Sequence, residues 1–148
     1  MLFRSFVTPD LRVAKPPQDY EQEIRVPGQA ILPDVGIAIE ARCIPADQVG
    51  EYNADELLDL DSLSGQLRVR NWRAGDRFWP AHTKSPRKIK ELLQERHVGQ
   101  PERALWPVVV HDNEIVWVRG FAAHARYVAK PGCRGVLFRD RTRFKGKT

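Results

Sequence analysis

The sequence predicts an α+β domain built mainly from short strands, with two or three short helices. Apolar and polar residues alternate over several stretches of about four to eight residues, which is the period of a half-buried strand. Turn residues, chiefly Gly, Pro, Asn and Asp, separate these stretches. With 148 residues and 42% hydrophobic content, the chain is long enough to form one domain with its own core.

Two strands are expected near the start of the chain. Residues Glu23–Val26 run into a Pro27-Gly28 turn, which is a typical strand ending. Residues Val35–Arg42 alternate between aliphatic side chains and small or charged ones, so one face of that strand should be buried.

A first helix is expected to begin at Asn53, which suits an N-cap and is followed three residues later by Glu56. The side chains that would face inward are Leu57, Leu58, Leu60 and Leu63. The acidic residues of this segment match no metal-binding loop and are expected on a solvated face; they are Asp55, Glu56, Asp59 and Asp61.

The most regular strand pattern covers Leu67–Arg73. Leu67 and Val69 should share one face of this strand, and its basic residues should occupy the other. The turn after it contains Asp76, a carboxylate with the chemistry of a general base. The favoured interpretation is a turn carboxylate that accepts hydrogen bonds from nearby N–H groups or pairs with an arginine.

A second helix is expected over Lys84–Gly99. Ser85 suits an N-cap, Pro86 suits the first helical position, and Gly99 suits a stop. The inward stripe is formed by Ile89, Leu92, Leu93 and the aliphatic stem of Arg96.

A hairpin is expected in the second half of the chain. Trp106–Val110 and Glu114–Val118 flank His111-Asp112-Asn113, which has the composition of a turn. Further strands are expected around Phe121–Val128 and Gly135–Phe138.

These elements place the folded domain at residues 21–138. Residues 1–20 contain three prolines without periodicity and are expected to be a leader or linker, or a piece of preceding structure. Residues 139–148 are expected to form a basic, mobile tail. Cys43 and Cys133 show no paired spacing, and neither an export signal nor a membrane-length apolar stretch is apparent, so the cytoplasm is the expected compartment.

The net charge of +5 conceals an uneven distribution along the chain. Residues 1–66 hold 5 basic and 12 acidic residues, whereas residues 67–148 hold 19 basic and 7 acidic ones. A segment so rich in positive charge favours a polyanionic partner, usually a nucleic acid. Charge alone does not separate RNA from DNA, or either of them from an acidic protein.

The candidate phosphate-binding residues lie in this basic half. Cations gather at the start of the Lys84–Gly99 helix, where the helix dipole makes each of them unfavourable by roughly 0.3–1 kcal/mol. Free backbone N–H groups and basic side chains at such a point suit a phosphate, and the alternative is a solvated basic face. Arginines just upstream favour the phosphate interpretation; the candidate set is Arg68, Arg70, Arg73, Arg77, Lys84, Arg87, Lys88, Lys90 and Arg96.

Aromatic residues lie among these cations. Trp72 and Trp79 are candidates for stacking on unpaired bases. Phe78 and Trp106 are expected to be packing residues instead. No catalytic centre is apparent, because the sequence has no G-x-x-x-x-G-K-[ST], G-x-G-x-x-G or Ser-Gly-Gly-x-Asp-Ser loop for a nucleotide, and its four histidines lack zinc-ligand spacing. Neither a cofactor nor a metal is therefore expected on this chain.

The motif Arg73-Ala74-Gly75-Asp76-Arg77-Phe78, preceded by a basic strand and followed by Pro80, resembles the signature of the C-terminal domain of tRNA(Ile)-lysidine synthetases. The lysine-rich segment 84–96, Arg103 ahead of the Pro-led strand at 106–110, and the hairpin partner at 114–120 also resemble that family. Upstream, Val26-Pro27-Gly28 and the run 59–67 resemble the lead-in to that domain. The resemblance covers about residues 21–128.

The resemblance implies a layered α/β fold with a β-sandwich of unusual topology, also seen in the phenylalanyl-tRNA synthetase β subunit. It implies that the complete enzymes use ATP and Mg in an N-terminal domain to adenylate the wobble cytidine of an isoleucine tRNA, after which lysine displaces AMP to give lysidine. In that family the C-terminal domain holds the acceptor end of the tRNA and helps to reject methionine tRNA. The expected partners are isoleucine tRNA and the separate catalytic domain, without which this chain should be inactive. A stand-alone RNA-binding module and a protein–protein interaction domain are the alternatives.

Overall fold

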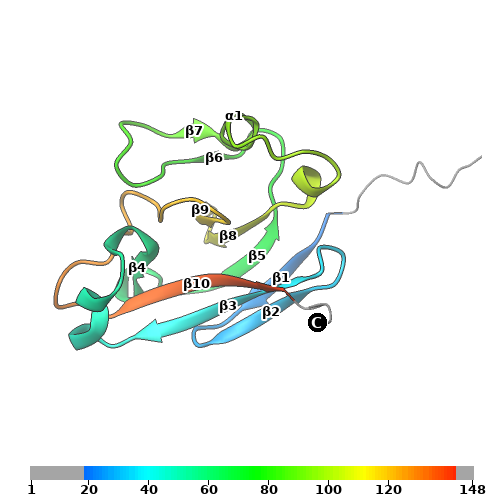
Figure 1. Ribbon diagram of the computed structural model, residues 1–148. Helices are drawn as coiled ribbons and strands as arrows, with labels where there is room; N and C mark the ends of the chain where they lie inside the picture. The colour runs from blue at the N-terminus through cyan, green and yellow to red at the C-terminus, as the bar shows by residue number, and fades with distance from the viewer. Residues whose placement is uncertain (1–18, 143–148) are drawn as a thin grey trace, which may run out of the picture.

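In the computed structural model, which describes residues 19–142, the chain forms three antiparallel sheets and few short helices (Figure 1). Sheet 1 has the order β1 (Glu21–Ile24), β5 (Leu67–Asn71), β8 (Pro107–His111), β9 (Glu114–Val118). Sheet 2 has the order β2 (Gly28–Leu32), β3 (Ile37–Ile44), β10 (Gly135–Thr142), β4 (Leu57–Asp59). Sheet 3 pairs β6 (Arg77–Phe78) with β7 (Arg87–Lys88). The helices are α1 (Ile89–Glu95) and the 3-10 helices η2 (Ala46–Glu51), η3 (Ala54–Glu56), η4 (Leu60–Ser62) and η5 (Glu102–Leu105).

Sheets 1 and 2 pack face to face across the main hydrophobic core. Alternation along β5 directs Leu67 and Val69 into this core, as the sequence predicted, and Ile39 and Phe138 enter it from sheet 2. Full burial of a side chain of this size stabilises the fold by about 1.5–3 kcal/mol relative to exposure. The other face of β5 is thereby left for Arg68 and Arg70.

A third layer, made of sheet 3 and α1, covers part of the other face of sheet 1 (Figure 1). Phe78, Ile89 and Leu93 are at most 1% exposed and pack against Val108 and Val118 of sheet 1. The prediction that Phe78 is a packing residue is therefore confirmed. This layer covers sheet 1 on the side opposite to sheet 2.

The second predicted helix exists, but it begins later than predicted. Residues Arg87–Lys88 pair with β6, so the chain is still extended there and Lys88 is the N-cap. Ser85 is therefore not the cap and Pro86 is not the first helical residue. The backbone N–H of Ile89 donates to the Asp76 carbonyl (3.0 Å), which joins the helix start to the β5–β6 turn.

The end of α1 also differs from the prediction. His97 adopts a left-handed conformation (φ 58°), and the N–H groups of His97 and Val98 donate to the carbonyls of Gln94 and Leu93. This pair of bonds is the Schellman motif, usually closed by glycine. The helix is therefore closed at His97, before Gly99 is reached.

The helix predicted from Asn53 is absent from the structure. Asn53 does cap a turn, since its side chain accepts from the Asp55 N–H (3.0 Å), but η3 is short and leads directly into β4. Leu57 and Leu58 are both 0% exposed because β4 pairs with β10 and is covered on both faces. Leu58 belongs to the main core and Leu57 to a separate cluster, so adjacent leucines reflect a two-sided strand rather than a helix stripe.

Three other predictions about strands need correction. Strand β2 was not predicted, and it forms a hairpin with β3. The segment Phe121–Val128 is not a strand; it makes only the isolated bridges Pro80↔His124 and Leu58↔Val128. Strand β10 continues to Thr142, so residues 139–142 extend sheet 2 instead of beginning a tail.

The expected leader and tail lie mostly outside the described residues. Tyr20, the last residue of the expected leader, is joined to the domain: its hydroxyl donates to the Leu105 carbonyl (2.7 Å), and burial raises its pKa. Among residues 19–142, none of the helices has the length and apolar character required of a membrane span.

Candidate nucleic-acid interface

The turn between β5 and β6 is organised by Asp76. Its two carboxylate oxygens accept from Arg70 at 2.8 and 3.2 Å, and one of them also accepts from the backbone N–H of Arg73 at 2.6 Å. The Arg70 and Asp76 side chains are only 15% and 18% exposed. Gly75 (φ 91°) supplies the left-handed residue that this turn requires. The prediction of a turn carboxylate paired with an arginine is therefore confirmed.

A polar groove lies on the same face of sheet 1 as sheet 3, in the part of that face that sheet 3 leaves uncovered. Its volume is about 860 Å³, and we call it the arginine groove because Arg68, Arg70 and Arg73 line it together with Glu21, Gln66, Val110, Asp112 and Asn113. The alternation of β5 places Arg68 and Arg70 on this face, opposite to the core residues Leu67 and Val69. The fold therefore brings together three of the predicted phosphate-binding residues.

Within the groove the three arginines are used differently. Arg70 is held by Asp76 and has little accessible surface. Arg68 is 46% exposed and pairs with Glu21 (2.7 Å). Arg73 is 40% exposed and lies 3.6 Å from Glu21 and 3.7 Å from Asp19, so neither carboxylate is within ordinary hydrogen-bond distance of it.

Four other predicted cations lie on or next to sheet 3. Arg77 and Lys88 are directly opposed residues of β6 and β7, so their side chains share the exposed face of this small sheet. Like charges in that arrangement repel. Lys84, in the β6–β7 connection, and Lys90, in the first turn of α1, are exposed as well. We call these residues the hairpin cations; none of the four forms an ion pair with an acidic residue in the part of the chain that the structure describes.

Arg87 and Arg96, also predicted to bind phosphate, take part in internal contacts. Arg87 reaches from β7 to Glu95 (3.0 Å) and approaches Glu91 (3.7 Å). The hydrogen bond from Arg87 lowers the pKa of Glu95. Arg96 donates to the Gly120 carbonyl (2.7 Å) and lies 4.0 Å from the centre of the Phe121 ring. These contacts attach α1 to β7 and to the segment that follows β9.

The two candidate stacking residues are half-buried and fixed by hydrogen bonds. Trp72 donates from Nε1 to the Arg103 carbonyl (2.6 Å), and Trp79 donates to the Thr83 carbonyl (2.8 Å). Arg126 lies 5.7 Å from the Trp79 ring centre and is exposed, which adds a cation that the sequence analysis did not single out. No local pattern around Arg126 could have identified it, because its proximity to Trp79 depends on the fold.

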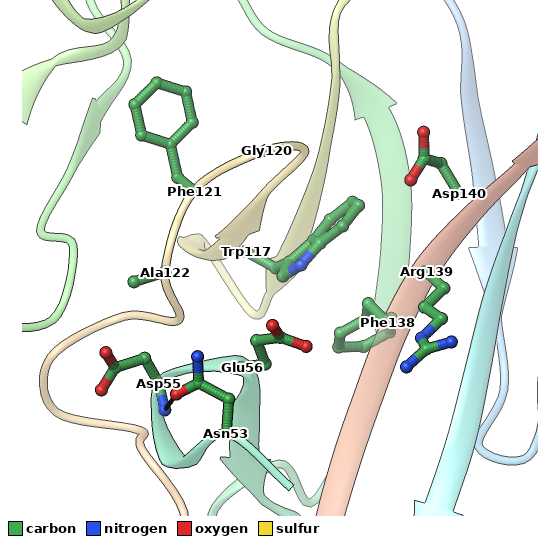
Figure 2. Close-up of a pocket in the computed structure, with 10 residues that line it drawn as sticks. All are labelled: Asn53, Asp55, Glu56, Trp117, Gly120, Phe121, Ala122, Phe138, Arg139 and Asp140. Atoms are coloured by element: carbon green, nitrogen blue, oxygen red, sulfur yellow. Dashed lines mark hydrogen bonds between the residues drawn. The ribbon is translucent and has the colours of Figure 1, made fainter.

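A second cavity, of about 450 Å³, lies between the end of β9, η3 and β10 (Figure 2). Its floor includes Trp117 and Phe138, which are only 6% and 4% exposed. Its charged lining consists of three carboxylates and one guanidinium, those of Asp55, Glu56, Asp140 and Arg139. This excess of negative charge is unfavourable for a phosphate, so the cavity is not part of the candidate interface.

Behind Trp79, His124 is 4% exposed and its environment favours the neutral ring. Its Nδ1 accepts from the Arg126 backbone N–H (3.1 Å), which leaves Nε2 to donate toward Glu114 (3.3 Å). Burial lowers the pKa of His124, although Glu114 acts in the opposite direction. Protonation of Nδ1 would break the bond from Arg126.

We expect the free energy of unfolding to fall as the pH is lowered below about 6.5, the ordinary pKa of histidine in an unfolded chain. The pKa of His124 in the folded protein lies below that value, so on acidification the unfolded state takes up a proton before the folded state does. The contribution of neutral His124 to the free energy of unfolding is therefore complete above about pH 6.5 and is lost as the pH falls. Urea unfolding between pH 5 and 7.5 measures this dependence. His124→Asn, whose side-chain oxygen can accept from Arg126, should show a weaker dependence; equal pH dependence in both proteins would rule out this role.

Comparisons with known proteins agree with the resemblance seen in the sequence. The family described as "TilS substrate C-terminal domain" matches residues 67–139. The tRNA(Ile)-lysidine synthase of Symbiobacterium thermophilum is 32% identical over 116 residues, covering 77% of this chain and 24% of that protein. The tRNA(Ile)-lysidine synthase of Solibacter usitatus is 34% identical over 140 residues, covering 90% of this chain and 32% of that protein.

A solved structure described as the crystal structure of a TilS C-terminal domain has the same fold, with a TM-score of 0.70 at 31% identity. The match covers 86% of this chain and 100% of that one. By contrast, the chain spans only 24% and 32% of the length of the two curated relatives named above. A match to the whole of the isolated domain, at this identity, shows that the chain belongs to the TilS C-terminal substrate-binding domain family.

Proposed function

We propose that this chain is the tRNA-binding domain of a tRNA(Ile)-lysidine synthase, that it holds the acceptor end of an isoleucine tRNA, and that it takes no part in the chemistry itself. The observation that carries this proposal is the set of hairpin cations beside the arginine groove, in a chain of this family. Four exposed cations without acidic partners among residues 19–142 repel one another unless a polyanion neutralises them.

The two parts of the interface suit different contacts with RNA. The hairpin cations project from the outer layer of the domain and suit backbone phosphates, which position the nucleic acid. The arginine groove offers guanidinium, amide and carboxylate groups next to one another, which can bond to phosphates or to base edges. Acidic groups border both parts of this surface: Glu21 and Asp112 line the arginine groove, and Asp55 of η3 lies 2.6 Å from His82 in the β6–β7 connection.

The remaining chemistry is proposed to belong to another part of the enzyme. The relatives' name refers to the formation of lysidine in isoleucine tRNA, which in the resemblance described above uses ATP, Mg and lysine in a separate catalytic domain. Within residues 19–142, no group of His, Cys, Asp or Glu side chains is arranged to hold a metal ion. The catalytic domain is therefore the second proposed partner of this chain.

We expect the chain to bind isoleucine tRNA more tightly than methionine tRNA, with a strong dependence on salt. If about four to six phosphates are neutralised, the slope of log K against log salt should be roughly −3 to −5. Fluorescence anisotropy with both tRNAs over a salt series measures affinity, preference and slope together. A slope near zero would favour the protein–protein interaction domain, and a steep slope without preference would favour a stand-alone RNA-binding module.

A further inference from the structure

Glu21 has a particular position in the arginine groove. It opens the edge strand β1, where its Cα partner on β5 is Arg70, so its side chain lies among the groove arginines. Its Oε2 is 2.7 Å from Nη1 of Arg68, and its Oε1 is 3.6 Å from Nη2 of Arg73. One carboxylate oxygen is thus directed to each guanidinium. Two arginines bind the two free oxygens of a phosphodiester in the same manner.

We propose that Arg68 and Arg73 form a phosphodiester site whose place is taken by Glu21 in the free protein, and that an RNA backbone phosphate displaces the Glu21 carboxylate on binding. This inference rests on the proposed function in so far as the ligand is RNA. It gives Glu21 the role of a residue that limits which anions the groove accepts.

Glu21 does not satisfy the hydrogen-bond donors of the Arg73 guanidinium. The guanidinium of Arg73 makes no hydrogen bond with the residues that the structure describes, and its Nε is inaccessible to solvent without a partner. A guanidinium has five donors, so much of its bonding capacity is unused. The backbone of Arg73 is nevertheless fixed by Asp76. Arg73 is therefore held in place for an acceptor that residues 19–142 do not supply.

Displacement of Glu21 is feasible because its ion pair is exposed. Arg68 and Glu21 are 46% and 34% exposed, and exposed pairs of this kind contribute little to stability. The groove volume of about 860 Å³ leaves space for Glu21 to move aside while a phosphate enters. A single small anion gains little binding free energy when it displaces Glu21. An RNA that also contacts the hairpin cations gains additionally from counterion release and should compete successfully.

The test is Glu21→Gln, with Glu51→Gln as its matched control. Glu51 lies in η2, is exposed, forms no ion pair with another described residue and does not line the groove, so its replacement removes the same charge without opening the site. Glu21→Gln should bind isoleucine tRNA about two- to fivefold more tightly at moderate salt, and Glu51→Gln by less than about twofold. Equal gains in the two variants would mean a general charge effect and would overturn the proposal.

A second comparison removes the site itself. In an Arg68→Gln, Arg73→Gln background, Glu21→Gln should change tRNA affinity by less than about twofold, the gain expected from charge alone, because the site that Glu21 occupies has been removed. A gain of about two- to fivefold that persists in this background would overturn the proposal. Thermal melts of each variant confirm that the folded proteins are being compared.

A readout without tRNA separates this proposal from the proposed function. Inorganic phosphate, added at constant ionic strength against chloride, should shift the NMR signal of the Arg73 Nε–H in Glu21→Gln more than in the unmodified protein. If that shift occurs but no tRNA binds, the anion site stands and the RNA function fails. If tRNA binds equally well to both proteins and phosphate leaves the Arg73 signal unchanged, the RNA function stands and the Glu21 site is wrong.

Discussion

Asp76→Asn is expected to lower the free energy of unfolding by about 2–3 kcal/mol and, at the same time, to weaken tRNA binding. The substitution breaks the bidentate pair with Arg70 and weakens the bond from the Arg73 N–H. Both side chains of the pair are less than one-fifth exposed, so Arg70 loses a partner that water replaces poorly. Urea unfolding measures the first effect.

The effect on binding has an informative sign. Removal of a carboxylate from a basic surface should by charge alone strengthen the binding of a polyanion. We expect the opposite, because Asp76 fixes the backbone of Arg73 and the side chain of Arg70 within the groove. Anisotropy measured well below the melting temperature tests this expectation. The matched control is Asp47→Asn in η2, an exposed acid for which stability should change by less than about 0.5 kcal/mol. Tighter binding by Asp76→Asn would refute the positioning role.

The double variant Arg77→Gln, Lys88→Gln is expected to lose about tenfold or more in tRNA affinity at roughly 0.1 M salt, while the salt slope becomes less steep by about two units. The two residues face each other across sheet 3 and have no acidic partner among residues 19–142. Thermal stability should hold or rise slightly, because the repulsion between two opposed cations is relieved. A loss of binding without a loss of stability identifies a ligand contact.

A matched control removes two exposed cations from sheet 2, with Arg42→Gln and Arg139→Gln. The net charge changes by the same amount, so any excess loss in the hairpin variant is due to position. Equal losses in affinity and slope would mean that sheet 3 is not a phosphate anchor. Arg87→Gln gives a useful contrast: because Arg87 pairs with Glu91 and Glu95, stability should fall there rather than hold.

Several features were predictable because they depend on local patterns. The alternation in β5, the hairpin β8–β9 and the apolar stripe of α1 each involve residues within one short segment. The role of Asp76 was also predictable, since the turn that it stabilises lies within six residues of Arg70. Each of these features follows from the local backbone geometry of a strand, turn or helix, which the sequence of that segment determines.

The secondary structure around β4 depended on the tertiary structure. Successive leucines at 57 and 58 fit a helix stripe, and they form a strand only because β10, from far along the chain, pairs with them and both faces are covered. The start of α1 was displaced for a similar reason: pairing of Arg87–Lys88 with β6 keeps the chain extended past Ser85 and Pro86. Long-range strand pairing thus overrode the local helix signals.

What the sequence determined by itself was the strand pattern of sheet 1, the turn held by Asp76 and the concentration of positive charge after residue 66. Only the tertiary structure decided which of those charges are available to a ligand. Arg68 meets Glu21 from 47 residues away and Arg96 meets Gly120 from 24 residues away, whereas Arg77 and Lys88 are left facing each other. The availability of a cation depends on the carboxylates and carbonyls within a few ångströms of it, and folding, not sequence proximity, brings those groups near.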